Sequence, residues 1–161
     1  EVDFSFTFLE NRKMKFPLTQ LTAEQVIGFN KKVIADAHKK DSSCQQKHVI
    51  GDRNKLEGCL GGIFYQGYGQ GYLNWPIEKM AGLLLYRIAE GQFFLEGNKR
   101  TAVVSSYFFL FNNGYILKFT KEEMSDLMWG FSADPNDPQA PRKYTESGPI
   151  QVILNCTNIL T

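Results

Sequence analysis

Residues 76–114 read PIEKMAGLLLYRIAEGQFFLEGNKRTAVVSSYFFLFNNG, two apolar segments joined by a short polar stretch. Pro76 suits the first turn of a helix. The apolar residues that follow at helical spacing are Ile77, Met80, Ala81, Leu84 and Ile88. A second helix, apolar on nearly every side, is expected from about Asn98 to Asn112, and Asn113-Gly114 is typical of a helix end. The stretch therefore predicts two buried helices with polar residues at their junction.

The segment before this pair predicts one further helix and a loop. Thr22 and Gln25 match a capping box, and apolar residues follow them at helical spacing, so we expect a helix over about 22–40. Residues 57–75 are rich in glycine and aromatic residues, which disfavours a stable helix and favours a mobile flap or hairpin. The exposed backbone of such a flap, about residues 61–72, could accept a peptide as an added strand.

The two ends of the chain carry weaker patterns. Alternating phenylalanines over residues 4–8 fit a short strand or an extended arm. A second capping box at Thr120–Glu123 predicts a helix that continues to about Phe131. A proline-rich loop follows, and residues 147–160 fit a terminal helix.

Length and composition define the broad class. The chain has 161 residues, of which 43% are hydrophobic, and a formal net charge of +1. We expect one mainly α domain over residues 1–161, with an arm at 1–20, a core at about 20–132, and a loop plus helix at 133–161. The balanced charge predicts no nucleic-acid or anionic-membrane partner, because no overall field attracts one.

Cysteine spacing and apolar runs exclude several other classes. Cys44, Cys59 and Cys156 are far apart and show no zinc-site spacing, so reduced structural thiols are expected. The apolar run at 102–111 is too short to span a bilayer, and we expect no membrane partner. Residues 1–4 show no basic and apolar leader, so we expect a cytoplasmic protein, with a secreted effector as the alternative.

The polar junction between the two buried helices contains the candidate binding residues. Gly97 allows the backbone to approach a ligand, and the N–H groups at the start of the next helix form an anion site. Lys99 and Arg100 place two positive charges there, and Glu96 is a hard oxygen ligand suited to Mg²⁺. The alternative is a solvated helix start that Asn98 caps.

This junction closely resembles the signature of the Fic/Doc (Fido) family. The signature reads His, any residue, Phe, any residue, Asp or Glu, Gly, Asn, Lys or Gly, and Arg. Six positions match: Phe94, Glu96, Gly97, Asn98, Lys99 and Arg100. Lys99 and the trailing Thr-Ala look like the Doc, or death-on-curing, branch. The Fic branch has a second Arg where this chain has Val103.

The resemblance implies a Fido-type helical bundle that uses Mg²⁺ and ATP. It implies that Glu96 holds Mg²⁺, that Gly97 and Asn98 shape an anion hole, and that Lys99 and Arg100 grip nucleotide phosphates. The flap at 61–72 would hold a protein target so that a Ser or Thr hydroxyl faces the phosphate. Doc-like toxins phosphorylate a translation factor, whereas Fic-like enzymes transfer AMP to a hydroxyl.

Gln92 departs from the family, because it stands where the signature has its catalytic His. A neutral amide can orient a hydroxyl but cannot take its proton, so we expect an enzyme that is inactive or impaired. Neither His38 nor His48 is assigned a role. The alternatives are a Fic-type adenylyltransferase and a pseudoenzyme that binds a nucleotide or a partner. The family's inhibitory pattern, a Ser or Thr four residues before a Glu-Gly or Glu-Asn pair, is not present. An inhibitor would therefore be a separate antitoxin chain, or would be unnecessary because the site is already disabled.

Overall fold

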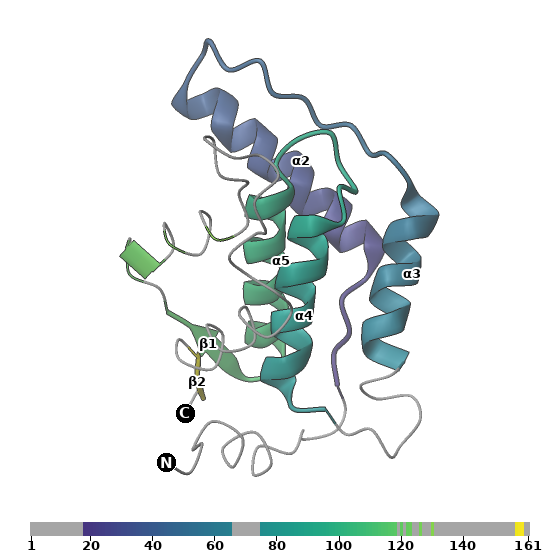
Figure 1. Ribbon diagram of the computed structural model, residues 1–161. Helices are drawn as coiled ribbons and strands as arrows, with labels where there is room; N and C mark the ends of the chain where they lie inside the picture. The colour runs from purple at the N-terminus through teal and green to yellow at the C-terminus, as the bar shows by residue number, and fades with distance from the viewer. Residues whose placement is uncertain are drawn as a thin grey trace.

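The computed structural model describes residues 18–65, 75–118, 120, 122–123, 126 and 130, and the backbone of residues 157–159. The described elements in chain order are α2 (Ala23–Lys40), α3 (Arg53–Phe64), α4 (Ile77–Glu90), α5 (Asn98–Asn112), β1 (Tyr115–Leu117) and β2 (Thr157–Ile159). This architecture confirms the expected mainly α fold (Figure 1).

Helices α4 and α5 form an antiparallel hairpin at the centre of the bundle, with their connecting loop at the top of Figure 1. Both bounds of α5 are those that the sequence predicts. The face of α5 toward the core carries small residues such as Ala102, Ser105 and Ser106, all fully buried. Ser106 Oγ donates a 2.8 Å hydrogen bond to the carbonyl of Ala81 on α4. Small side chains therefore let the two backbones approach closely.

The outer face of α5 is more exposed than the sequence pattern suggests. Tyr107 and Phe111 keep 42% and 50% of their surface accessible, and their rings stack with centroids 6.2 Å apart. Phe109 and Leu110 are buried instead. α5 packs against α4, α2 and β1 but leaves Tyr107 and Phe111 accessible, so the prediction that the helix is buried on nearly every side is too broad.

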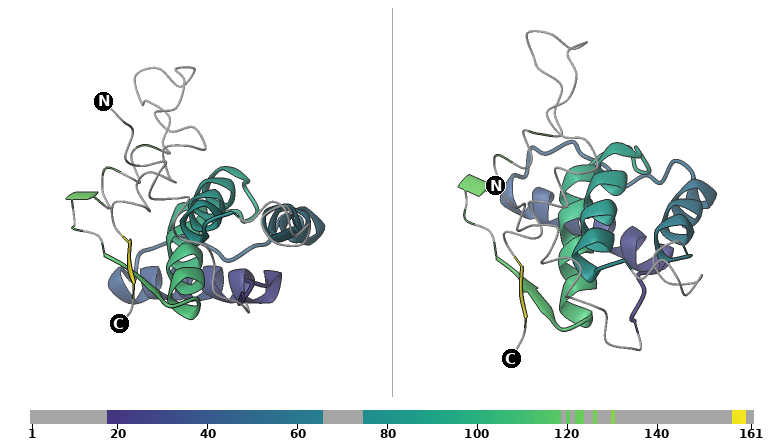
Figure 2. Two further views of the ribbon diagram at one scale, coloured as in Figure 1. Left: turned by 90° about the horizontal axis from the view of Figure 1, so that it is seen from below. Right: turned by 60° about the horizontal axis from the view of Figure 1, so that its bottom comes forward.

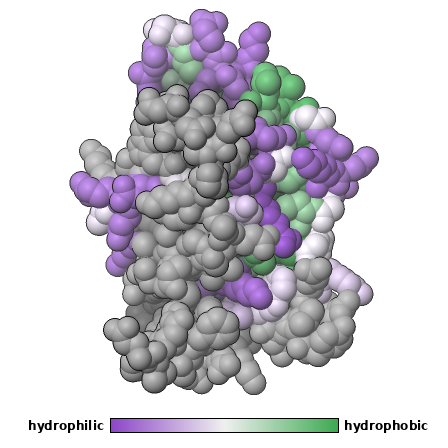
Figure 3. Space-filling model, in the orientation of Figure 1, coloured by the Kyte–Doolittle hydropathy of each residue, from purple (hydrophilic) through white to green (hydrophobic). Residues whose placement is uncertain are grey.

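Helix α2 crosses this hairpin, as both views in Figure 2 show. The predicted capping box is confirmed: Gln25 N–H donates to Thr22 Oγ1 at 3.3 Å, and Thr22 N–H donates to Gln25 Oε1 at 2.9 Å. Val26, Val33 and Ile34 are buried along its inner face. The far end of α2, rich in charged residues, and the connection that follows it lie at the top of Figure 3, where the surface is mostly hydrophilic.

The prediction of a flap over residues 57–75 is wrong where the structure describes it, because residues 57–64 belong to α3. Asp52 caps this helix, since its side chain accepts a hydrogen bond from Lys55 N–H at 3.1 Å. Leu56, Leu60 and Ile63 lie at helical spacing and are buried in the core. Their burial outweighs the cost of about 1 kcal/mol that each helical glycine adds. Residues 66–74 of the expected flap lie outside the described residues.

A short antiparallel ladder closes the described part of the fold. β1 pairs with β2, with Tyr115 opposite Ile159 and Leu117 opposite Thr157. The predicted terminal helix over 147–160 is therefore wrong at 157–159. Without a partner strand, the backbone N–H and C=O groups of β1 would lack hydrogen bonds. Residues 157–159 can supply that strand, because two of the three are β-branched and favour an extended backbone. The rest of that expected helix, the proline-rich loop and residues 1–17 of the expected arm lie outside the described residues.

Further local features are described at Gly114, at the second capping box and at two of the cysteines. Gly114 takes the left-handed conformation (φ 86°) predicted after α5. At the second capping box, Glu123 N–H donates to Thr120 Oγ1 and Thr120 N–H donates to Glu123 Oε2. Cys44 and Cys59 are free thiols, and burial raises the pKa of Cys59. Within the described ranges, no helix has both the length and the apolar character needed to cross a bilayer.

Candidate functional site

The polar junction predicted from the sequence is the loop at residues 91–97 between α4 and α5, here called the signature loop. Gly97 is the N-cap residue of α5 in a left-handed conformation (φ 78°), with no side chain capping the helix. A Cβ at Gly97 would lie 3.1 Å from Asn30 Nδ2, so both its conformation and its contact with α2 require glycine. No side chain therefore caps the first N–H groups of α5.

Asn98 has a different role from the helix cap considered above. Its Oδ1 accepts a hydrogen bond from Phe94 N–H at 3.0 Å, and its Nδ2 donates to the Phe94 carbonyl at 2.8 Å. Asn98 is buried. Because both ends of its amide bond the backbone of Phe94, Asn98 closes the signature loop, and neither amide group is directed at a ligand through these bonds.

Asn30 of α2 connects the signature loop to the first turn of α5. This residue is completely buried, and its Nδ2 donates to the Glu96 carbonyl at 2.9 Å and to Thr101 Oγ1 at 3.0 Å. Its Oδ1 lies 2.6 Å from Nδ1 of His48. Since the amide oxygen only accepts, the His48 ring donates from Nδ1. One buried side chain therefore fixes three separate segments.

The segment at residues 46–51 lies against the signature loop. Ile50 and Phe94 form an antiparallel bridge, with main-chain hydrogen bonds of 2.8 Å on either side. Lys47 N–H donates to Glu96 Oε2 at 2.5 Å. Figure 1 shows the connection between α2 and α3 passing over the top of the bundle, beside this loop. The signature loop is thus held from both sides, by α2 and by the 46–51 segment.

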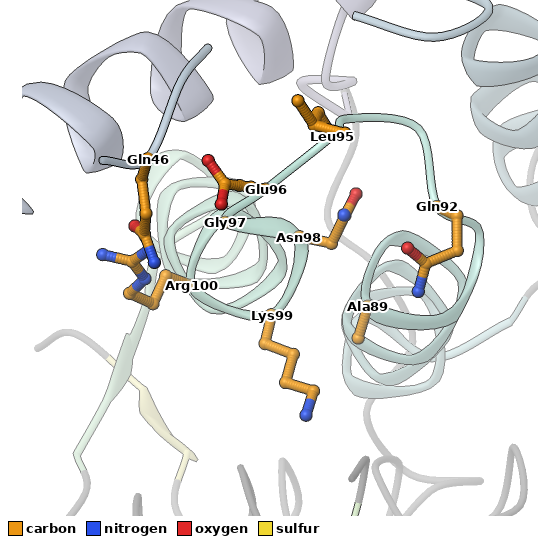
Figure 4. Close-up of a pocket in the computed structure, with 9 residues that line it drawn as sticks. All are labelled: Gln46, Ala89, Gln92, Leu95, Glu96, Gly97, Asn98, Lys99 and Arg100. Carbon is orange, nitrogen blue, oxygen red and sulfur yellow. The ribbon is translucent and has the colours of Figure 1, made fainter. Parts of the chain in front are cut away.

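A pocket of about 320 Å³ opens at the start of α5. Figure 4 shows its lining residues: Gln46, Ala89, Gln92, Leu95, Glu96, Gly97, Asn98, Lys99 and Arg100. Gln46 and Arg100 meet on one side of the helix start, Gln92 and Ala89 lie on the other, and Lys99 projects between them. The tertiary structure therefore gathers every site residue predicted from the sequence into one pocket.

The three charged side chains of this pocket, Arg100, Lys99 and Glu96, lie in different surroundings. Arg100 is exposed, and its Nη2 donates to Gln46 Oε1. Burial lowers the pKa of the Lys99 ammonium, because partial desolvation disfavours its charge. The Glu96 carboxylate points toward the side of Gln46, away from Lys99. The pocket thus presents cations at a helix N-terminus and a carboxylate at its edge.

Gln92 stands where the Fic/Doc signature has its histidine, and it is exposed at the pocket's wall. Its φ of 51° is the one positive value at a non-glycine residue within the described part of the chain. Left-handed backbone costs a residue with a Cβ roughly 1–2 kcal/mol, so the loop holds Gln92 under strain. Neither histidine lines the pocket.

Sequence reasoning missed Gln46 in the lining of the pocket, and it missed Asn30 and His48 among the residues that support the signature loop. Gln46 lies in a polar segment with no motif, 54 residues before Arg100. Asn30 carries one signal, because a polar residue on the apolar face of a predicted helix needs a buried partner. His48 is half-buried, and burial together with the charge of Lys31 lowers its pKa.

The chain has no significant match among known families. No protein-family model matches the sequence, and no curated protein matches it. The resemblance to the Fic/Doc signature therefore depends on the residues of the signature loop.

Proposed function

We propose that the chain binds Mg²⁺ and ATP at the start of α5 as a Doc-like, toxin-type phosphotransferase that Gln92 leaves impaired. The acceptor would be a Ser or Thr hydroxyl of a protein target such as a translation factor. The observation that carries this proposal is the pocket in which Lys99 and Arg100 surround an uncapped helix N-terminus. Cations at this end of a helix are unfavourable by themselves, and a bound phosphate would reverse that cost.

The phosphate part of the ligand fits the residues present. The first N–H groups of α5 have no acceptor within the helix. The guanidinium of Arg100 has five N–H donors, of which its bond to Gln46 uses one. A phosphate would also favour the charged form of Lys99, whose pKa burial lowers. These groups would hold and orient a polyphosphate chain, and ATP would supply the phosphoryl group.

The residues present could hold Mg²⁺ through one protein ligand. No cluster of three His, Cys, Asp or Glu side chains occurs among the residues that the structure describes. Mg²⁺ commonly keeps several waters and binds one carboxylate together with substrate phosphates. Glu96 could provide that carboxylate through Oε1, because its Oε2 accepts from Lys47 N–H. Glu96 would then hold the metal at the edge of the phosphate site.

The side chain at position 92 would set the rate of phosphoryl transfer. It lies across the pocket from Arg100, where its amide could orient a target hydroxyl. Loss of a general base costs about 10² to 10⁴ in rate. A pseudoenzyme that binds nucleotide without transferring it is therefore the second candidate. AMP transfer is less favoured, because Val103 stands at the position of the second Arg of the Fic branch.

The first experiment is calorimetric titration of the protein with Mg²⁺ and ATP. Glu96→Ala and Arg100→Ala should each weaken binding at least tenfold, about 1.4 kcal/mol. Lys32→Ala removes an exposed charge from α2 and should leave binding unchanged. Absence of binding by the parent protein would contradict the proposal and favour a role in protein interaction.

A second experiment restores the missing base. Gln92→His should fold normally, because histidine tolerates left-handed backbone better than most residues. Transfer of label from γ-labelled ATP to a lysate protein would support the Doc-like reaction, and transfer from α-labelled ATP would support AMP transfer. No gain from either label, with binding intact, would support the pseudoenzyme.

A further inference from the structure

A second pocket of about 320 Å³ lies between α2 and α5, here called the α2–α5 groove. Its apolar wall consists of Val33 and Ala37 from α2 with Val103 and Val104 from α5. Arg100 lines this groove as well as the pocket at the start of α5. The two cavities therefore adjoin at one side chain.

Helical spacing explains why these residues form one groove. Counted from Val33, the lining residues of α2 lie at offsets of three, four and seven residues, and counted from Arg100, those of α5 lie at offsets of three and four. Each set occupies a single helix face. Asp36 and Lys40 belong to the same face of α2 and bring an acceptor and a donor to an otherwise apolar cavity. Ligand sites commonly combine apolar walls with a few polar groups in this way.

We infer that the α2–α5 groove receives the nucleoside half of the nucleotide whose phosphates lie at the start of α5. This inference rests on the proposed function and names the remainder of its ligand. A nucleobase has two apolar faces and a polar edge, which suit the valine walls and the polar pair of Asp36 and Lys40. Arg100 would lie where the phosphates join the nucleoside.

The distance along α5 allows one molecule to reach both cavities. Val104 lies seven residues beyond Gly97, the N-cap of α5, which is about 10 Å at a rise of 1.5 Å per residue. Each cavity is near the lower limit for a complete small-molecule site, about 300 Å³. A ligand with a polyanionic end and a flat apolar end accounts for both cavities and for their shared arginine.

The test compares ATP with inorganic tripolyphosphate, each titrated calorimetrically with Mg²⁺. Ala37→Trp fills the groove, and Ala35→Trp places the same side chain on the exposed side of α2 as a matched control. Ala37→Trp should weaken ATP binding at least tenfold and leave tripolyphosphate binding unchanged. Ala35→Trp should affect neither ligand, and Arg100→Ala should weaken both.

The outcomes separate this inference from the proposed function. Equal ATP affinity in Ala37→Trp and the parent, with tripolyphosphate still bound, would overturn the groove assignment and leave the phosphate site intact. Failure of the parent to bind either ligand would overturn both. If Ala37→Trp does not fold, methyl NMR of the parent decides: ATP, but not tripolyphosphate, should shift the resonances of Val103 and Val104.

Discussion

The main-chain N–H of Lys47 donates a 2.5 Å hydrogen bond to Oε2 of Glu96, a residue 49 positions further along the chain. This bond orients the carboxylate proposed to hold Mg²⁺. The preceding residue, Gln46, accepts a hydrogen bond from Arg100, the residue proposed to hold phosphate. Two consecutive residues of the α2–α3 connection therefore contact the carboxylate of Glu96 and the guanidinium of Arg100. Substitutions in that connection can therefore test both proposed roles.

A negative charge introduced at position 46 should weaken anion binding. Gln46→Glu would pair with Arg100 and place a negative charge in the pocket, so tripolyphosphate should bind at least tenfold more weakly than to the parent. Gln46→Ala removes the contact without adding charge and should change the dissociation constant less than threefold. Equal affinities in Gln46→Glu and the parent would show that the anion binds elsewhere.

Asn30 should be important for stability. Asn30→Ala removes the partner of the Glu96 carbonyl, of Thr101 Oγ1 and of His48 Nδ1. Each buried group left without a partner costs about 1–3 kcal/mol, so we expect a loss of about 3 kcal/mol in the free energy of unfolding. Urea unfolding measures it, with Lys32→Ala as a surface control on the same helix. A loss below about 1 kcal/mol, the lower end of that cost for a single group, would contradict this network.

The His48 ring should make stability depend on pH. Its pKa in the folded protein lies below the ordinary 6.5, chiefly through burial and also through the charge of Lys31. The unfolded chain therefore binds the proton more tightly, and stability present above about pH 6.5 falls as the pH drops below it. His48→Gln should flatten this part of the profile. An unchanged slope on the acid side of neutral pH would show that His48 does not contribute.

Substitutions at position 92 that relieve or increase backbone strain should change the stability of the protein. Gln92→Gly removes the Cβ at a φ of 51° and should raise the free energy of unfolding by about 0.5 kcal/mol, after the greater entropy of glycine in the unfolded chain is included. Gln92→Val should lower it by about 1 kcal/mol, because a β-branched residue fits this conformation poorly. Thermal unfolding of the two variants should bracket the parent, and the reverse order would contradict the left-handed conformation.

The helical state of α3 predicts an effect that a flap would not show. Gly58 lies in the helix interior, and a Cβ added there would have no atom within 4 Å, so Gly58→Ala should stabilise the protein by about 1 kcal/mol. Gly114→Ala is the opposing control, because its φ of 86° disfavours any residue with a Cβ. A destabilised Gly58→Ala variant would contradict the helix at that position.

The sequence by itself determined the elements whose signals are local. The capping box of Thr22, the bounds of α5 and the grouping of residues 92–100 at one helix junction all follow from spacing and side-chain chemistry. These features depend on neighbours a few residues away, which the linear pattern displays. The mainly α class follows from the same local signals.

Only the tertiary structure decided the remainder. Residues 57–64 are helical because Leu56, Leu60 and Ile63 reach a core formed by other helices, and that burial is not visible in a glycine-rich segment. The contact between Gln46 and Arg100 spans 54 residues, and Asn30 joins segments that the sequence keeps apart. Long-range contacts are set by how helices pack against one another, so the supports of the site appear only once the chain is folded.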